Sequence, residues 1–452
     1  MLTPITQNIM IFLVLLTLVV PRKYVLAPFM LAACFVPTDQ RFILAGLDFT
    51  VLRVLVLAGA ARIFLRGETR PIVWNKFDKL LFAWVLCGAL IYTVRFHTPG
   101  AAINRLGYLF DVLGLYWIFR LSLTDINDVK RVFYMLGFCA IALCPLVALE
   151  WSRGENPFSL LGRAVTFYRD GRYRCQAAFP HSIMLGLFFA TLIPAFAALA
   201  LLDKRKLFFG AAIGTSIYIV FATASSTPLA TLMFVILMLF LFPYRIHGAI
   251  FMKGMIVCLT ILHFIMDAPV WHLIARANIV GGSTGWHRFH LIDKAIKHLP
   301  EWFLIGCNQT VHWGMGLRDV TNQFILEGVR GGLITMILFI ILLVMAARAA
   351  NRVSLQPMSK HQQLFFWSLN VIITGHCVSF LGVSYFGQIQ MLLYLNFAMI
   401  GILYKSSLKP NPALGLSGSR SGTDSVKTRS AVAGRLRHRR ARRYIIDPTG
   451  RH

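Results

Sequence analysis

The sequence predicts an all-α, polytopic integral membrane protein, and its composition and the spacing of its apolar residues support this. Residues of the set AVILMFWYC make up 57% of the 452 residues, whereas Asp, Glu, Lys and Arg make up only 14%. Ordinary soluble domains carry about 45–50% apolar and about 25% charged residues. The apolar residues also fall into runs near the ~20 residues that a helix needs to cross a bilayer. These observations exclude an ordinary cytosolic enzyme, a disordered chain, a coiled coil and a collagen-like fibre.

The apolar runs predict 12 or 13 membrane spans within residues 1–404, which we expect to form one membrane domain. The first two runs are short, so one of them could be a hairpin or a re-entrant piece. No basic residue precedes the first run and no small-residue cleavage site follows it, so we do not expect a cleaved signal peptide. The runs lie near residues 7–20, 24–37, 43–65, 78–94, 104–122, 130–150, 178–202, 206–223, 228–243, 248–268, 325–347, 364–384 and 387–404.

A basic segment at the C-terminal end sets the expected orientation. Residues 405–452 contain 12 basic and 2 acidic side chains, a net charge of +10. Such a segment could bind nucleic acid or anionic lipid. We favour a disordered cytoplasmic tail and no nucleic-acid partner, because "RLRHRRARR" has no aromatic residues for base stacking. Basic residues in the short loops 66–77, 203–206 and 348–362 then also lie on the cytoplasmic side.

With this orientation, two long polar segments lie on the outer face: the first outer loop (about 151–177) and the second outer loop (about 269–324). Each carries an excess of basic residues, a net +3 in the first and +2 in the second, on the side where positive charge is normally sparse. A solvated face of salt bridges is one interpretation. We prefer a cationic cleft at the membrane surface, suited to an anionic, membrane-borne substrate.

Part of the second outer loop predicts an amphipathic helix within "STGWHRFHLIDKAIKHLPEW". Ser283 or Thr284 would cap this helix and Pro300 would limit it. It would either lie in the interface plane with its basic face toward lipid phosphates or pack under the loop. Its apolar residues recur at i+3/i+4 spacing and its polar residues share another face: Phe289, Ile292, Ile296, Leu299 and Phe303, and His290, Lys294, Lys297 and Glu301.

Common catalytic motifs are absent from the sequence, which has no Walker loop, no GxGxxG after a strand, no HExxH and no GxSxG elbow. The outer loops contain no pair of close acidic residues, so we predict no metal site and no cofactor. Phosphate would then be neutralised by Arg and Lys, and the planar fork of Arg suits this role. The eight cysteines lack metal-ligand spacing, and Cys175 and Cys307 could pair if the loops face an oxidising compartment.

Three segments share their order and spacing with a known family. They are "RCQAAFPHSIMLG" (174–186), "STGWHRFHLIDKAIKHLPEWFLIGCN" (283–308) and "DVTNQFILEGVRGGL" (319–333). In these segments, and in its profile of about twelve spans with a large outer loop before the last few helices, the chain resembles the O-antigen ligase and Wzy-type polymerase family of bacterial polysaccharide assembly.

The resemblance implies a glycosyltransferase-C-like, metal-independent inverting glycosyltransferase in the bacterial inner membrane. Its active site would lie on the periplasmic side and its C-terminus in the cytoplasm. Family members take glycan units from an undecaprenyl-pyrophosphate carrier and join them to another carrier-linked glycan (polymerase) or to lipid A core (ligase). The implied partners are the undecaprenyl-pyrophosphate-linked glycan, the lipid bilayer, and a chain-length regulator and flippase of a polysaccharide assembly system. No cofactor is implied.

The resemblance carries the pyrophosphate-binding role onto Arg174 and Arg288, with Arg172 and Arg318 as weaker candidates. It adds Asn322, the polar residue of the third segment, as a further substrate-binding candidate. These five residues belong to the outer loops or to their junctions with the following helices.

The chain departs from the family pattern at Ala177, where the family often has Gly, and at Thr321, where the ligases often have His. The missing His favours polymerisation of a surface or exopolysaccharide over ligation to lipid A, and it leaves the general base open. Asp319, one helical turn before Asn322, and His312 are the two catalytic candidates. Either could instead be a salt-bridge or capping residue.

Two alternatives have no bond-making chemistry: a secondary transporter or flippase of lipid-linked sugars, and a non-catalytic assembly component. A transporter would place coupling carboxylates near the midplane and show repeats with broken helices, and the sequence shows little of either. We expect Glu327 to be structural, pairing with Arg330 or Arg174. Polar residues within spans are expected to bond to neighbouring helices: Arg53, Asp111, His263, His376 and Gln388.

Overall fold

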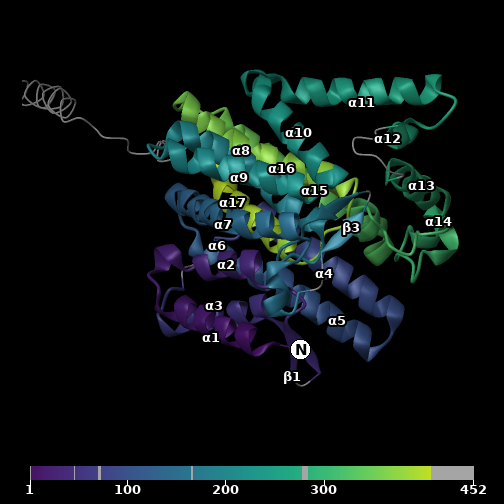
Figure 1. Ribbon diagram of the computed structural model, residues 1–452. Coiled ribbons are helices and arrows are strands. Elements are labelled where there is room, and N and C mark those ends of the chain that lie inside the picture. The colour runs from purple at the N-terminus through teal and green to yellow at the C-terminus, as the bar shows by residue number, and fades with distance from the viewer. Residues whose placement is uncertain are drawn as a thin grey trace, which may run out of the picture. The chain divides into compact units, whose positions relative to one another are not determined.

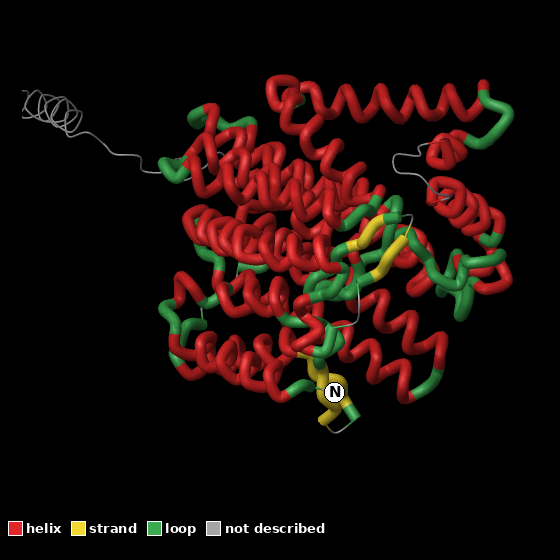
Figure 2. The backbone as a smooth tube through the Cα atoms, viewed as in Figure 1, coloured by secondary structure: helices red, strands yellow, loops and turns green. Residues whose placement is uncertain are grey.

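The computed structural model (Figure 1) describes residues 2–44, 46–69, 73–163, 166–169, 171–276 and 284–408, and most of these residues belong to helices. All of these residues belong to one unit, Met1–Pro410. Within them, the strands form two antiparallel two-stranded hairpins, drawn in yellow in Figure 2. The expected all-α class is confirmed. The predicted tail 405–452 lies outside the described residues from residue 409 onward.

The N-terminal third of the chain contains shorter helices and the first hairpin. Its elements are α1 (Pro4–Val19), η1 (Arg22–Tyr24), α2 (Ala27–Phe35), β1 (Arg41–Leu44), β2 (Leu47–Thr50), α3 (Val51–Leu65), α4 (Lys76–Phe96), α5 (Pro99–Leu109), the π-helical η2 (Phe110–Gly114), α6 (Leu115–Ser122) and α7 (Ile126–Arg153).

The rest of the chain contains the two outer loops and most of the long helices. Its elements are η3 (Pro157–Leu161), β3 (Phe167–Arg169), β4 (Arg172–Arg174), α8 (Ser182–Leu202), α9 (Lys206–Ala222), α10 (Ser226–Phe240), η4 (Phe242–His247), α11 (Gly248–Ile265), η5 (Val270–His272), α12 (Leu273–Arg276), α13 (Thr284–Lys297), α14 (Leu299–Trp302), η6 (Val311–Trp313), α15 (Gln323–Ser354), α16 (Lys360–Phe380) and α17 (Gln388–Leu408).

Seven helical segments among the described residues are long and apolar enough to cross a membrane, so the protein is a polytopic membrane protein. They are α4, α7, α8, η4–α11, α15, α16 and α17. Three further apolar helices, α1, α9 and α10, have 10–17 residues. The predicted run 24–37 contains only the nine-residue α2, and the run 43–65 begins with the β1–β2 hairpin. Apolar content alone did not distinguish these short elements from full spans.

The amphipathic helix predicted in the second outer loop is confirmed as α13. It ends at Lys297, three residues before Pro300, which lies in the first turn of the separate short helix α14. Glu301 therefore lies on α14 rather than on a face of α13. Of the two predicted caps, Thr284 is the first residue of α13, and Ser283 lies outside the described residues.

The core of the bundle is built around α8. In its most apolar 18-residue stretch, 78% of the residues are buried by protein, the largest share among the seven long segments. It packs against α9, α16 and α10. Apolar, buried residues occur on every face of α8, as expected of a helix enclosed by protein. Gly186 allows a close approach to α10, because a Cβ there would lie 2.7 Å from the ring of Pro228.

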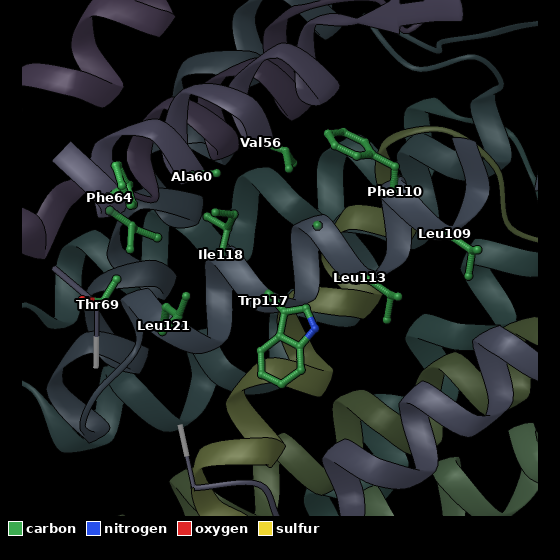
Figure 3. Close-up of a pocket in the computed structure, with 12 residues that line it drawn as sticks. Val56, Ala60, Phe64, Thr69, Leu109, Phe110, Leu113, Trp117, Ile118 and Leu121 are labelled. Atoms are coloured by element: carbon green, nitrogen blue, oxygen red, sulfur yellow. The ribbon is translucent and has the colours of Figure 1, made fainter. Parts of the chain in front are cut away.

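In contrast, no residue in the most apolar stretch of η4–α11 is buried by protein. Figure 1 shows α11 away from the other long helices. An apolar hollow of about 600 Å³ also opens between α3 and η2–α6 (Figure 3). Its lining includes Val56, Phe64 and Trp117 and no residue of either outer loop. In a bilayer, apolar surfaces of this kind face acyl chains.

The 32-residue helix α15 is broken at two glycines. Gly331 and Gly332 have non-helical dihedral angles, with φ −141° at the first and φ +73°, ψ 177° at the second. A Cβ at Gly332 would lie 2.1 Å from the carbonyl oxygen of Leu304. Only glycine fits this conformation and this contact.

Backbone of the second outer loop closes the break. The N–H of Leu333 donates to Phe303 O (2.9 Å), and the N–H of Cys307 donates to Val329 O (3.0 Å). Arg95 of α4 donates to Val329 O as well (2.9 Å). Irregular backbone at membrane depth must be hydrogen-bonded by protein. The second outer loop supplies these bonds, so the break in α15 depends on it.

Most polar residues predicted to bond to neighbouring helices do so. Arg53 pairs with Asp111 at 2.6 Å, and His376 lies between Tyr385 (2.7 Å) and Asn396 (3.1 Å). These contacts confirm a structural interpretation. Two others bond nearby: Gln388 donates to Ala178 O at 2.8 Å, and His263 accepts from the N–H of Val270 at 3.4 Å.

Glu327 is structural, as expected, but it makes no direct ion pair among the described residues; Arg330 lines the same small cavity without pairing with it. Its carboxylate accepts from the indole N–H of Trp84 at 3.0 Å and from the amide of Gln323 at 2.8 Å. These donors come from α4 and from the preceding turn of α15. Glu327 therefore links two helices through neutral donors.

Candidate functional site

A buried carboxylate holds the first outer loop in place. Glu150, near the end of α7, is completely buried. Its two oxygens accept from the backbone N–H groups of Gln176 (3.0 Å) and Ala177 (2.8 Å), and one also accepts from the Thr166 hydroxyl (2.9 Å). These bonds fix the irregular segment that connects β4 to α8.

Arg163 reinforces the same segment. Its guanidinium pairs with Asp39 and donates to Gln176 Oε1 (3.1 Å) and Pro180 O (2.8 Å). Arg163 is buried. This arginine of the first outer loop is therefore neutralised within the fold, as the salt-bridge interpretation expected.

Ala177 occupies a position whose backbone conformation favours glycine. This residue has φ +48°, in the left-handed region that glycine adopts most easily. An L-residue pays roughly 1–2 kcal/mol there. Glu150 holds its N–H, and Asn156 donates to its carbonyl oxygen at 3.0 Å, so the surrounding bonds maintain the strained conformation.

Arg174 reaches the start of α10. It is the last residue of β4, and its Nη2 donates to Ser225 Oγ at 2.7 Å. Ser225 is the N-cap residue of α10, but its hydroxyl donates to Thr223 O (2.8 Å) and makes no capping bond. The first turn of the helix thus keeps its backbone N–H groups free of a side-chain cap.

Arg288 reaches the same turn from the second outer loop. It lies on α13, and its Nη2 donates to Thr227 Oγ1 at 2.6 Å. It also packs against the end of α16, where a Cβ at Gly382 would lie 3.2 Å from its Cζ. The two arginines predicted to bind pyrophosphate therefore converge on α10 through Ser225 and Thr227.

The N-terminus of α10 adds positive potential to this place. The first N–H groups of a helix lack intrahelical partners, and the helix dipole is positive at that end. A helix start beside two guanidinium groups is suited to a phosphate ligand. Arg174, Arg288, Ser225 and Thr227 are called the α10 cluster below.

His181 borders the α10 cluster. It is the N-cap residue of α8 and its Nδ1 accepts from the N–H of Ile183 at 3.1 Å, while the neighbouring Ser182 Oγ lies 3.4 Å from Ser225 Oγ. Burial, and then the charges of Arg174 and Arg163, lower the pKa of His181 to about 4. The ring is therefore neutral at pH 7, with its Nε2–H left as a donor.

Asn322 is linked to the surroundings of Arg288 through the end of α16. It is the buried N-cap residue of α15, where its side-chain oxygen accepts from the N–H of Ile325 at 3.1 Å. Its amide donates to Leu381 O at 3.4 Å, next to the Gly382 that packs on Arg288. The hydroxyl of Thr321 is buried and has no hydrogen-bond partner among the described residues.

The weaker candidates lie elsewhere on the loops. Arg172 is exposed and lines a separate hollow of about 800 Å³ together with aromatic residues such as Trp151 and Tyr218. Arg318 and Asp319 are exposed, and neither makes a hydrogen bond or ion pair within the part of the chain that the structure describes. None of the three contacts the α10 cluster through a hydrogen bond to described residues.

His312, the other candidate base, belongs to a group around Glu301. Its Nε2 lies 2.7 Å from Glu301 Oε2, and His298 Nδ1 lies 2.6 Å from Glu301 Oε1. The indole N–H of Trp313 donates to Glu301 at 3.0 Å and is the main cause that lowers the pKa of Glu301 to about 2. This ion-pair geometry fits the salt-bridge alternative for His312.

The possible disulfide is wrong in this structure, because Cys175 and Cys307 are both free. Burial raises the pKa of the Cys175 thiol, which behaves as a small apolar group.

Sequence reasoning missed Glu150, Ser225 and Thr227. For the last two a signal exists, because "SSTP" (225–228) combines cap residues with a Pro in the first turn of an apolar run. Nothing local distinguishes Glu150, a lone acidic residue at the end of an apolar run.

Comparison of the sequence with protein-family models gives no match, and comparison with curated proteins gives none either.

Proposed function

We propose that the protein transfers a glycosyl group from an undecaprenyl-pyrophosphate-linked saccharide at the periplasmic face of the bacterial inner membrane. Polymerisation of a surface or exopolysaccharide is preferred over ligation to lipid A core, because Thr321 stands where the ligases often have His. The observation that carries the proposal is the convergence of Arg174 and Arg288, from two separate loops, on the uncapped start of α10.

The α10 cluster would act on the leaving group. The acceptor hydroxyl attacks the anomeric carbon, and the bond from that carbon to the diphosphate oxygen breaks. The carrier diphosphate leaves with the electron pair, and its growing charge is stabilised by the two guanidinium groups and the helix N-terminus. Neutral His181 adds a hydrogen-bond donor without a further charge.

The acceptor's proton needs a base. Asp319 remains the better of the two candidates, because its carboxylate is exposed and has no ion-pair partner among the described residues. His312 is held by Glu301 at 2.7 Å. In a largely dissociative transition state the acceptor hydroxyl keeps most of its proton, so proton removal by either residue would matter little.

The proposed topology has the outer loops in the periplasm and the C-terminus in the cytoplasm. Contacts of α1 support an odd number of crossings. Its first end lies at the first outer loop, since the Thr3 N–H donates to Gln40 Oε1 (2.8 Å) and Gly162 packs against Gln40. Its other end lies at Arg62, which donates to Thr17 O (2.7 Å) at the cytoplasmic side of α3. Of the two expected counts, 12 and 13, the odd one agrees with these contacts; the segment from η1 through α2 would then return the chain to the outer side without a full-length spanning helix.

Arginine variants test the proposal. Purified protein is incubated with a lipid-pyrophosphate-linked oligosaccharide, and both longer glycan and free carrier pyrophosphate are measured. R174A and R288A should each lose about 10²–10³-fold in rate, as expected for removal of one preorganised charge-stabilising donor. R153A is the matched control, an exposed arginine at the end of α7 outside the α10 cluster.

Wild-type rates in both R174A and R288A would reject the assignment of the site. A parallel reaction with lipid A core as acceptor separates ligation from polymerisation. Movement of the lipid-linked glycan across vesicles without a new glycosidic bond would favour the transporter instead.

A further inference from the structure

The group around Glu301 contains the ligand atoms of a metal site. His298, Glu301 and His312 each offer one such atom, and these atoms all lie within 4.8 Å of one another. The three residues come from two separate pieces of the second outer loop, the start of α14 and η6. They make no hydrogen bond to the α10 cluster.

Two imidazole nitrogens and one carboxylate oxygen form a recognisable donor set. Zn²⁺ sites that keep a position open for water often have three protein ligands, and two His with one Glu is one of the common combinations. Imidazole also binds the neighbouring divalent transition metals, whereas Mg²⁺ and Ca²⁺ prefer oxygen ligands throughout. The chemistry therefore points to Zn²⁺ or a similar ion.

The directions of the donor atoms agree with this set. His298 Nδ1 and His312 Nε2 approach opposite oxygens of the same carboxylate, at 2.6 and 2.7 Å. The two rings are nearly perpendicular, with centroids 5.5 Å apart and an interplanar angle of 85°. Both nitrogens thus face one small space next to the Glu301 carboxylate.

A buried residue supports the ligands. Trp313 is 1% exposed and packs in a core with Leu291 and Trp302. Its indole N–H donates to Glu301 at 3.0 Å, and its ring stacks on that of His298 at an interplanar angle of 11°. Partners of this kind orient metal ligands and strengthen binding.

Solvent can reach the group. The side chains of His298, Glu301 and His312 are 27%, 38% and 48% exposed. An ion could therefore enter from the aqueous side and keep a water molecule as its fourth ligand.

We propose that His298, Glu301 and His312 form a binding site for one Zn²⁺ ion in the second outer loop. The ion would join α14 to η6 and so hold the segment that leads to Asp319 and Asn322. This role does not depend on the proposed glycosyl transfer. Sequence analysis predicted no metal because the outer loops contain no pair of close acidic residues. The spacing H-x₂-E-x₁₀-H also matches no common zinc motif, so it gives no local signal.

Direct titration tests the site. The full-length protein, purified in detergent without a polyhistidine tag and treated with a chelator, is titrated with Zn²⁺ against a chromophoric zinc chelator. Tail residues His438 and His452 are replaced by Ala in every sample, so that they do not contribute. We expect one site per chain, weakened at least tenfold in H298A, H312A and E301Q.

H287A is the matched control, since His287 lies on α13 in the same loop and outside the group. Wild-type affinity in the three ligand variants, or equal weakening in H287A, would overturn the proposal. X-ray absorption of the zinc-loaded wild-type protein gives an answer that does not depend on how the variants fold. It should show imidazole and oxygen ligands. Sulfur ligands would overturn the assignment, because they would locate the ion at cysteines.

Discussion

The two outer loops carry similar net positive charge but are built in different ways. The first is held by groups inside the bundle, since Glu150 binds its backbone and Arg163 is neutralised by Asp39. The second packs Trp302 and Trp313 into a core that it shares with Ile325 and Val329 of α15, and its acidic group Glu301 is partly exposed. Polar groups therefore fix the first loop to the bundle, whereas apolar side chains fix much of the second.

This difference shows that a count of basic residues does not identify those that can bind a ligand. Arg163 and Arg174 belong to the same loop, yet the first is buried against a carboxylate and the second reaches the start of α10. Arg288 reaches that start from the other loop. Position relative to helix ends and carboxylates decides the role, and only the folded chain fixes it.

The largest expected effect concerns the attachment of the second outer loop. In G332A, the new Cβ would lie 2.1 Å from Leu304 O, and Ala would have to adopt φ +73°. Backbone strain and steric overlap together should cost about 2–6 kcal/mol. Thermal unfolding in detergent should show a much lower midpoint or no folded protein.

The control for G332A is G210A, an exposed position in α9 where a Cβ meets nothing within 4 Å. It should unfold at or slightly above the wild-type midpoint. Equal midpoints for both variants would mean that the loop is not fixed to α15 at Gly332.

The second prediction separates the two arginines of the first outer loop. R163A removes the partner of Asp39 and leaves the Gln176 side chain and Pro180 O without that donor, so it should destabilise the fold by about 2–4 kcal/mol. R174A removes the hydrogen bond to Ser225 Oγ and should destabilise the fold less than R163A does. Glycan extension per folded molecule should show the reverse order. Equal stability losses would remove the distinction drawn between them.

The third prediction concerns acid. The pKa of His181 is lowered from 6.5 to about 4 by burial and by Arg174 and Arg163, so the folded protein binds this proton less well than the unfolded chain. The free energy of unfolding therefore falls as the pH drops from 6.5 to about 4, because the unfolded chain takes up the proton first. Above pH 6.5 and below about pH 4, His181 adds no further pH dependence. For Glu301, with a pKa lowered from 4.5 to about 2, the loss lies between those two values. The start of α8 and the second outer loop should therefore lose stability in different pH ranges.

H181N tests this, because Asn can still cap α8 but does not titrate. Its unfolding midpoint should vary less than that of the wild type between pH 6.5 and 4. An identical pH profile in both proteins would assign the effect to another group.

The smallest effect is expected for A177G in the first outer loop. Glycine removes the cost of the left-handed conformation and adds some entropy to the unfolded chain, for a net gain of about 0.5–1 kcal/mol. The unfolding midpoint should rise slightly. A lower midpoint would show that the bonds of Glu150 and Asn156 have already relaxed the strain at this position.

The long helices and α13 could be predicted, because apolar length and 3.6-residue periodicity are local properties. The short α2 could not, since its residues are as apolar as those of the spans, and the β1–β2 hairpin was hidden because β2 runs directly into the apolar residues of α3. Arg174 and Arg288 could be selected as candidates from their loops. Their meeting at Ser225 and Thr227 depends on how α10 packs against α8, which no local pattern contains.

The length of α15 also fixes depth. Its apolar part ends at Ala347, before Arg348 and Arg352. From Gln323 to Ala347 the helix rises about 37 Å at 1.5 Å per residue, a little more than the ~30 Å thickness of the hydrocarbon layer, which puts Asn322 at the level of lipid head groups. A carrier lipid resting in its own leaflet holds its diphosphate at that same level. It could thus be engaged without being lifted out of the leaflet, and the energy of extracting its isoprenoid chain would not oppose the reaction.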